Sequence, residues 1–351
     1  MVSEGVQEQT IDWLRFFLAC LVVLLHAGAD GIQSSYPVYR TLCLLTTKGI
    51  CQIAVPCFFF ISGYLFFNHL EKWRFDIWRG KMSRRVSTLL IPYVLWNLIA
   101  IVSFILYSYL RTNIGSLDSP IKIDYHNLAV QLKDWFLGDK NSKMPIDYPL
   151  WFVRDLIVIT ILTPLIYLFC RYLRWYGVAV LAILVFIIPD LPKGVWFYIF
   201  GATLSIGGTS LVDLCSRIKW PATVIFLLLL CFLPVSYKSN PVRYHQLLFF
   251  FTIVGCIFAF AFSSMGIRNG LLHTHPFLTK SAFFIFASHG ILILDDFSRY
   301  ILLHITQYRG ELYYCCNLFI RPLIAISFCL ALFYCMNRWM PAITRVLIGA
   351  R

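Results

Sequence analysis

Long apolar runs recur along the whole chain and constrain its fold more than any other feature. About twenty apolar residues cross a hydrocarbon core of about 30 Å. Runs of this kind lie roughly at 13–29, 49–67, 87–110, 150–170, 176–189, 194–206, 221–236, 246–264, 277–294 and 316–336. Only 13% of the 351 residues are charged, against about 25% in soluble domains, so polar surface is too scarce to enclose these runs in water. The sequence predicts an all-α, polytopic transmembrane helical bundle of about ten spans.

The composition excludes other classes of protein. Disordered chains are polar and poor in aromatic residues, whereas 17% of this chain is aromatic. A net charge of +13 would suggest nucleic acid in a soluble protein, but here membrane orientation explains it better, and we expect no nucleic-acid partner. The 12 cysteines include no C-x-x-C pair and mostly lie singly in apolar runs. We therefore expect neither a disulfide framework nor a metal site.

Two of the runs are short, and prolines interrupt others. Runs 176–189 and 194–206 are separated by Pro189-Asp190-Leu191-Pro192, so they form either one re-entrant pair or two tilted spans. Proline removes a helical hydrogen bond and bends a helix. Kinks are therefore predicted at Pro56, Pro92 and Pro164.

The distribution of Lys and Arg predicts the orientation. The connection after the second run holds the densest basic cluster of the chain: Lys72, Arg74, Arg79, Lys81, Arg84 and Arg85. Short loops rich in Lys and Arg remain in the cytoplasm. With ten spans we expect cytoplasmic termini (1–12 and 337–351), an external connection at 111–149, and no separate soluble domain beside the membrane domain 13–336.

Arg15 and His26 are ionisable residues in the first apolar run. Eleven steps of 100° end about 20° from three whole turns, so the two residues share a helix face roughly 16 Å apart along the axis. Ionisable groups in a span are costly and usually functional. The alternatives are a snorkelling anchor for Arg15 and a hydrogen-bonded core histidine for His26.

A second histidine, His289, lies in the ninth run. If this run crosses in the same direction as the first, His289 and His26 lie at similar depth, and two imidazoles at one level suit a general base and its partner. Alternatively, the similar depth of His26 and His289 is a coincidence. Asp295 and Asp296 follow the run and are expected to mark its outer end rather than to form a catalytic pair.

Two further segments each allow a structural and a functional interpretation. Ser62-Gly63 in the second run is more typical of close helix packing than of catalysis. The basic loop suits orientation and contact with anionic membrane lipids. Alternatively, Arg84 and Arg85 bind phosphate groups through their forked guanidinium groups.

Together these segments resemble the acyltransferase-3 family of integral-membrane acyltransferases, over about residues 11–336. Ile11–His26 is similar to the family's Arg-x10-His signature, and Val55–Tyr64 to its V-P-x-F-F-x-x-S-G-Y segment. Lys81–Tyr93 resembles the basic loop that leads into the third span. Leu150–Leu156 and Ser281–His289 resemble the later W-F and S-x-x-x-Y-x-x-H segments.

The chain departs from the family pattern at two positions. The family often has Arg-x-x-Arg in the basic loop, and here Thr88 stands three residues after Arg85. A second guanidinium or ammonium group must then come from Arg84 or Lys81. Phe286 replaces the tyrosine that usually precedes the last histidine, so no phenol is available there.

The resemblance implies transfer of an acyl group, usually acetyl, from cytoplasmic acyl-CoA to a hydroxyl of a cell-surface carbohydrate or lipid-linked glycan. It further implies a multi-pass protein of the bacterial cytoplasmic (inner) membrane, with acetyl-CoA as donor and no metal. The expected catalytic residues are His26, Arg15 and His289; those for acyl-CoA are Arg84, Arg85, Lys81, Ser62 and Gly63; those for the acceptor are Trp151, Arg154 and Asp155.

Two alternatives remain open at this level. His26 can act as a general base on the acceptor hydroxyl or carry the acyl group itself. Buried histidines and kinked helices also suit a transporter of a glycan or small solute, although no inverted repeat is visible in the sequence.

Overall fold

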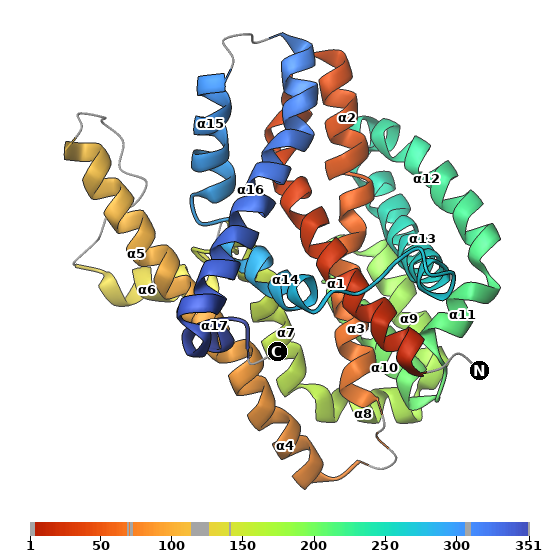
Figure 1. Ribbon diagram of the computed structural model, residues 1–351. Coiled ribbons are helices and arrows are strands. Elements are labelled where there is room, and N and C mark those ends of the chain that lie inside the picture. Colours follow the sequence, from red (N-terminus) through yellow and green to blue (C-terminus); the bar gives the residue numbers. More distant parts are fainter. Residues whose placement is uncertain are drawn as a thin grey trace. The chain divides into compact units, whose positions relative to one another are not determined.

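In the part of the chain that the computed structural model describes, regular structure is helical throughout (Figure 1). The described residues are 4–68, 70, 73–113, 126–139, 142–305 and 310–349. The α-helices are α1 (Glu4–Ala27), α2 (Pro37–Thr47), α3 (Ala54–Phe67), α4 (Phe75–Arg85), α5 (Ile91–Asn113), α6 (Leu128–Leu137), α7 (Trp151–Ile161), α8 (Thr163–Tyr172), α9 (Arg174–Ile187), α10 (Lys193–Ile206), α11 (Leu211–Arg217), α12 (Lys219–Ser239), α13 (Pro241–Arg268), α14 (Pro276–Ser288), α15 (Ser298–Ile305), α16 (Glu311–Trp339) and α17 (Pro341–Leu347). The predicted all-α class is confirmed.

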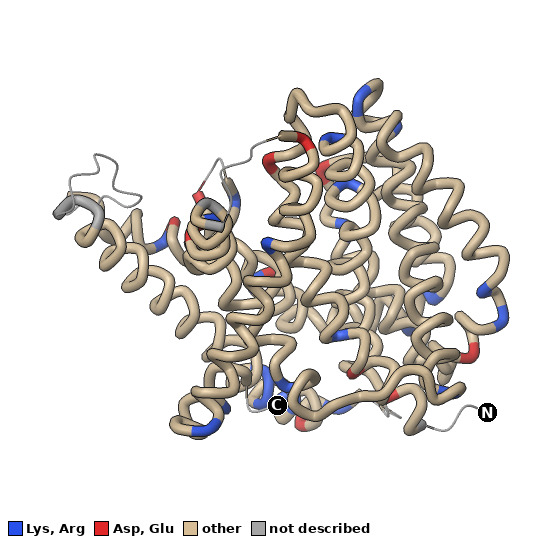
Figure 2. Tube along the Cα trace, turned by 45° about the horizontal axis from the view of Figure 1, so that its top comes forward, with Lys and Arg blue, Asp and Glu red and all other residues tan. Residues whose placement is uncertain are grey.

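The helices also confirm a polytopic membrane protein. Among the described residues, six helices are long and apolar enough to span a membrane, or up to nine if each of three bent pairs is one span. The shorter apolar helix α9 is additional. Each of the ten apolar runs overlaps one of these elements. Figure 2 shows the reason for this overlap: charged residues gather toward helix ends and leave long uncharged stretches between them.

The three prolines predicted to bend helices lie in first turns, where a missing N–H is tolerated. Pro56 is the third residue of α3, Pro92 the second of α5, and Pro164 the second of α8. At Pro164 the predicted kink is confirmed, because the chain bends by 66° between Tyr148–Ile161 and Thr163–Tyr172.

The chain divides into two compact units, each described here by itself. Unit 1 comprises Met1–Trp78, Leu162–Ala282 and Tyr308–Ile320. Unit 2 comprises Arg79–Ile161, Phe283–Gln307 and Arg321–Arg351. Of the predicted external connection 111–149, residues 114–125 and 140–141 lie outside the described residues, and the described part contains α6.

The core of unit 1 is built on a backbone contact between α3 and α10. A Cβ atom on Gly63 would lie 2.0 Å from the carbonyl oxygen of Tyr198, and one on Gly201 would lie 2.2 Å from that of Phe60. Glycine at both positions lets the two helices approach closely, as small residues do in membrane bundles. The aromatic rings of Phe60 and Phe200 stack beside this contact, 5.3 Å apart.

The core of unit 2 gathers around Trp96 of α5. Its indole N–H donates a hydrogen bond of 3.0 Å to the carbonyl oxygen of Leu347. Its ring meets the fully buried ring of Phe284 edge-on, with centroids 5.2 Å apart. These contacts attach α14 and the end of α17 to α5, and thereby fix the helix that leads to His289.

Candidate active site

Arg15 and His26 lie on one unbroken helix, α1, within unit 1. The continuous helix preserves their eleven-residue spacing, so they share a face as predicted. Arg15 Nη1 bonds Asp12 Oδ1 at 3.1 Å, and both side chains are partly exposed. The sequence reasoning did not identify Asp12 as the partner of Arg15, although its i,i+3 spacing was an available signal.

The end of α1 after His26 packs tightly against the end of α2. A Cβ atom on Gly28 would lie 2.3 Å from Thr47 Oγ1 and 2.9 Å from a methyl carbon of Leu318. Thr47 is 3% exposed, and its hydroxyl has no hydrogen-bond partner among the described residues. A buried hydroxyl without a partner is costly, and the sequence did not reveal this polar group beside Gly28.

The Ser62-Gly63-Tyr64 segment of α3 is held by a polar network within unit 1. The Tyr64 hydroxyl donates to the carbonyl oxygen of Thr209 at 3.2 Å and accepts from Gln7 Nε2 at 3.3 Å. Ser62 is half-buried, and Gly63 faces α10. Helix packing therefore accounts for Gly63 and Tyr64, and the predicted role of Ser62 and Gly63 in binding acyl-CoA stays a prediction.

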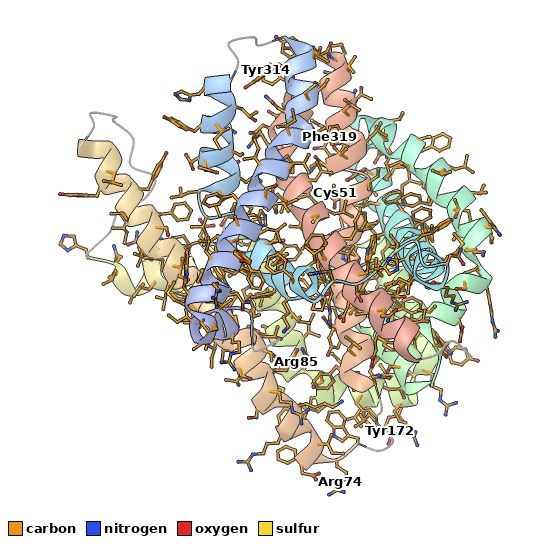
Figure 3. The ribbon with its side chains drawn as sticks, viewed as in Figure 1. Cys51, Arg74, Arg85, Tyr172, Tyr314 and Phe319 are labelled. Atoms are coloured by element: carbon orange, nitrogen blue, oxygen red, sulfur yellow. The ribbon has the colours of Figure 1, made fainter. Side chains whose placement is uncertain are left out.

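The basic residues Lys81, Arg84 and Arg85 lie on the last two turns of α4 within unit 2; Arg85 is labelled in Figure 3. Arg84 is exposed, while Lys81 and Arg85 are half-buried. Lys81 lies close enough to both arginines to be repelled by their charges. Holding like charges together creates a local positive potential that attracts anions, as the phosphate hypothesis requires.

Arg154, at the start of α7, holds the loop that follows α6. Its Nε and Nη2 donate to Asp155 Oδ1 at 2.9 and 2.8 Å, and its Nη1 donates to the carbonyl oxygens of Leu137 and Lys143. The guanidinium thus positions a segment of the 111–149 connection. Direct contact of Trp151, Arg154 and Asp155 with an acceptor stays a prediction.

His289 is fully buried within unit 2. Its Nδ1 lies 3.0 Å from the carbonyl oxygen of Ile285, and its ring meets those of Tyr148 and Phe286 edge-on, with centroids 6.3 and 6.4 Å away. The apolar run 277–294 was expected to form one helix, which is wrong. Helix α14 ends at Ser288, and the chain bends by 84° before it continues.

The break after His289 results from packing and backbone conformation. A Cβ atom on Gly290 would lie 2.9 Å from the ring of Pro149, so the turn Tyr148–Leu150 presses against the chain there. Leu292 adopts a left-handed conformation with φ 57°, which leucine rarely does. A π-helical turn, Ile293–Phe297, follows. His289 therefore lies in the turn directly after α14 and not on a face of a continuous helix.

Asp147 is a buried carboxyl group that the sequence reasoning did not identify. It is 1% exposed, and neither carboxylate oxygen has a hydrogen-bond partner among the described residues. Burial raises the pKa of this group well above its usual range. The available signal was an aspartate three residues before the apolar run 150–170.

Arg321 was also missed, although it stands inside the last apolar run. Its Nη2 lies 3.2 Å from Asp295 Oδ1 and donates to the carbonyl oxygen of Leu294 at the same distance. The Arg321 side chain is only 11% exposed. A paired charge within a span is a candidate functional group, so Asp295 does more than mark the end of a span.

Comparison with known proteins agrees with this arrangement of segments. The described residues define the class of all-helical, polytopic membrane proteins, with a basic helix α4 and with Arg15 and His26 on the first helix. The family described as "Acyltransferase domain" matches residues 8–336. The chain therefore belongs to the acyltransferase-3 family of membrane proteins, and acyl transfer is the activity of that family.

One curated relative covers nearly the whole chain. The succinoglycan biosynthesis protein ExoH of Rhizobium meliloti (strain 1021) is 26% identical over 357 residues, which are 97% of this chain and 92% of the relative. No solved structure matches the chain significantly.

Proposed function

We propose that this protein transfers an acetyl group from cytoplasmic acetyl-CoA to a hydroxyl of a cell-surface polysaccharide or its lipid-linked precursor. The observation that carries the proposal is the family match over 8–336 together with Arg15 and His26 on one unbroken helix. The relative named for succinoglycan biosynthesis supports a polysaccharide as acceptor. The membrane is then the bacterial cytoplasmic membrane, with both termini inside.

The donor is assigned to the basic end of α4. CoA carries several phosphate charges, and charge-assisted hydrogen bonds from guanidinium groups suit them. Lys81, Arg84 and Arg85 concentrate positive charge there, and the positive-inside rule favours a cytoplasmic position for this loop. Arg15 and His26, on one face of α1 in unit 1, are assigned to the acyl-transfer step.

In the transfer step, the oxygen of the acceptor hydroxyl attacks the carbonyl carbon of the thioester. A C–O bond forms and the C–S bond breaks, which gives an ester and CoA. His26 takes the hydroxyl proton as general base and passes it to the departing CoA sulfur, which leaves as the thiol. In the alternative sequence, His26 first attacks the thioester itself, and an acylated imidazole then passes the acyl group to the acceptor.

The test is CoA release by the purified protein in detergent, with acetyl-CoA and candidate glycans. His26→Ala should lower the rate by about 100- to 10,000-fold, the usual contribution of a general base. His273→Ala removes an exposed histidine on the loop after α13 and is the matched control, with unchanged rate expected. A His26→Ala variant within tenfold of the parent would remove His26 from the mechanism.

A further inference from the structure

A surface pocket of about 490 Å³ lies in unit 2, where α5 approaches the π-helical turn Ile293–Phe297 and the start of α15. Side chains that line it include Tyr107, Asp295, Asp296, Arg299 and Tyr300. Its volume falls in the range of small-molecule binding sites. The sequence interpretation favoured Asp295 and Asp296 as an outer boundary over a catalytic pair, and no role in the transfer step has been given to this pocket.

Both carboxylates of the pocket are fixed by side chains from other helices. The Tyr107 hydroxyl of α5 donates to Asp296 Oδ1 at 2.8 Å. Arg321 of α16 holds Asp295 Oδ1 at 3.2 Å. Each anchor uses one oxygen of its carboxylate in these bonds. A carboxylate has about four acceptor positions, so a hydroxyl ligand can share Asp295 and Asp296 with these anchors.

The charges and rings of the pocket select the class of ligand. Arg299 in the lining and Arg321 beside Asp295 offset the charges of the two carboxylates, so the pocket has no net charge that would select an anion such as a phosphate. Asp295 is already neutralised by Arg321, which weakens the attraction for a metal cation. Carboxylates are instead strong acceptors for neutral hydroxyl groups, and the ring of Tyr300, which is 62% exposed, offers a flat apolar face. A neutral pyranose ring has these features: several hydroxyl groups and an apolar face.

The pocket also continues directly from the turn that carries His289. Leu292, the residue with φ 57°, lines the pocket three residues after His289. The backbone N–H of Leu294 donates to the carbonyl oxygen of His289 at 3.1 Å. Asp295 and Asp296 follow at once, so one short segment presents both the histidine and the two acceptor groups.

We propose that this pocket binds a sugar ring of the acceptor, with Asp295 and Asp296 accepting from its hydroxyl groups and Tyr300 covering one face. This assignment rests on the proposed function, because it takes the acceptor to be a carbohydrate. It places acceptor recognition on unit 2.

The test measures binding directly, without acyl transfer. Saturation-transfer NMR with the purified protein in detergent uses methyl α-D-glucopyranoside and methyl β-D-galactopyranoside as neutral probes. Asp296→Asn should weaken binding by about tenfold, the effect of losing a charge-assisted hydrogen bond. Tyr107→Phe, which releases Asp296, and Tyr300→Ala should also weaken it. Asp190→Asn changes an exposed carboxylate in the turn before α10 and serves as the control, with unchanged binding expected.

A second measurement separates this proposal from the proposed function. With any glycan that supports CoA release, Asp296→Asn should raise the KM for the glycan and leave the KM for acetyl-CoA unchanged. Absence of pyranoside binding in the parent, or equal binding in all variants with unchanged melting temperatures, would overturn the pocket assignment. Pyranoside binding that Asp296→Asn weakens, in a protein that releases no CoA, would uphold the pocket and reject acyl transfer.

Discussion

Replacing Gly63 with alanine forces a methyl group against the backbone of α10. The new Cβ would lie 2.0 Å from the carbonyl oxygen of Tyr198 and 2.8 Å from its carbonyl carbon, whereas ordinary contacts begin near 3.4 Å. Both neighbours are backbone atoms and cannot rotate away, so α3 and α10 must separate. Overpacking of a tight core costs about 1–3 kcal/mol, and the rigid neighbours place Gly63→Ala at the upper end of this range.

The assay is thermal unfolding of the purified protein in one detergent, with Gly80→Ala as the matched control. Gly80 lies in α4, and a Cβ there meets nothing within 4 Å. Alanine is a better helix former than glycine by about 0.5–1 kcal/mol, so Gly80→Ala should raise the melting temperature while Gly63→Ala lowers it. An unchanged melting temperature in Gly63→Ala would refute the backbone contact. If activity also fell, Gly63 would act in the acyl-CoA passage instead.

Three further predictions concern donor binding, pH dependence and topology. Arg85→Ala should weaken CoA binding by about tenfold to a hundredfold, with partial rescue by Arg85→Lys, which lacks the forked geometry; calorimetric titration giving equal dissociation constants would reject the donor site. Burial raises the pKa of Asp147 in the folded protein. The free energy of unfolding should therefore be highest at low pH, where Asp147 is protonated in both states, and should fall as pH rises above the ordinary carboxyl range. Asp147→Asn should abolish this fall, so its melting temperature relative to the parent should increase from pH 5 to pH 8. A difference between the two melting temperatures that does not change with pH would contradict the raised pKa of Asp147. A cysteine introduced at Lys81 should be labelled only from the cytoplasmic side and one at Asp139 only from outside, and the reverse pattern would invert the topology.

The membrane helices were predictable because hydropathy alone determines which segments can enter lipid. The shared face of Arg15 and His26 was predictable for a related reason, since it depends only on helix periodicity along α1. The break after Ser288 was not, because it depends on Gly290 meeting Pro149, which is more than a hundred residues away in the sequence.

Partners of charged residues were equally inaccessible to sequence reasoning. Arg154 was assigned to the acceptor, yet its guanidinium bonds carbonyl oxygens of Leu137 and Lys143. Hydropathy and spacing show that a charged residue stands in an apolar run, but only the folded chain shows which groups the charged side chain contacts. For the same reason Arg321 could have been noticed as a charge in an apolar run, whereas its pairing with Asp295 could not.

The Arg321–Asp295 pair has a consequence for how the protein is made. Arg321 is ten residues into α16, about 15 Å from its start, and an arginine near the centre of a span costs roughly 2.5–3.5 kcal/mol during insertion by the translocon. Pro322 follows it directly. Asp295 is synthesised earlier, on the π-helical turn that precedes α15 and α16. The last span therefore enters the bilayer most easily after α14 and the π-helical turn are in place, so the order of synthesis assists its insertion. An Asp295→Ala chain should accumulate with its last span uninserted, which glycosylation-site or protease mapping of nascent chains would detect.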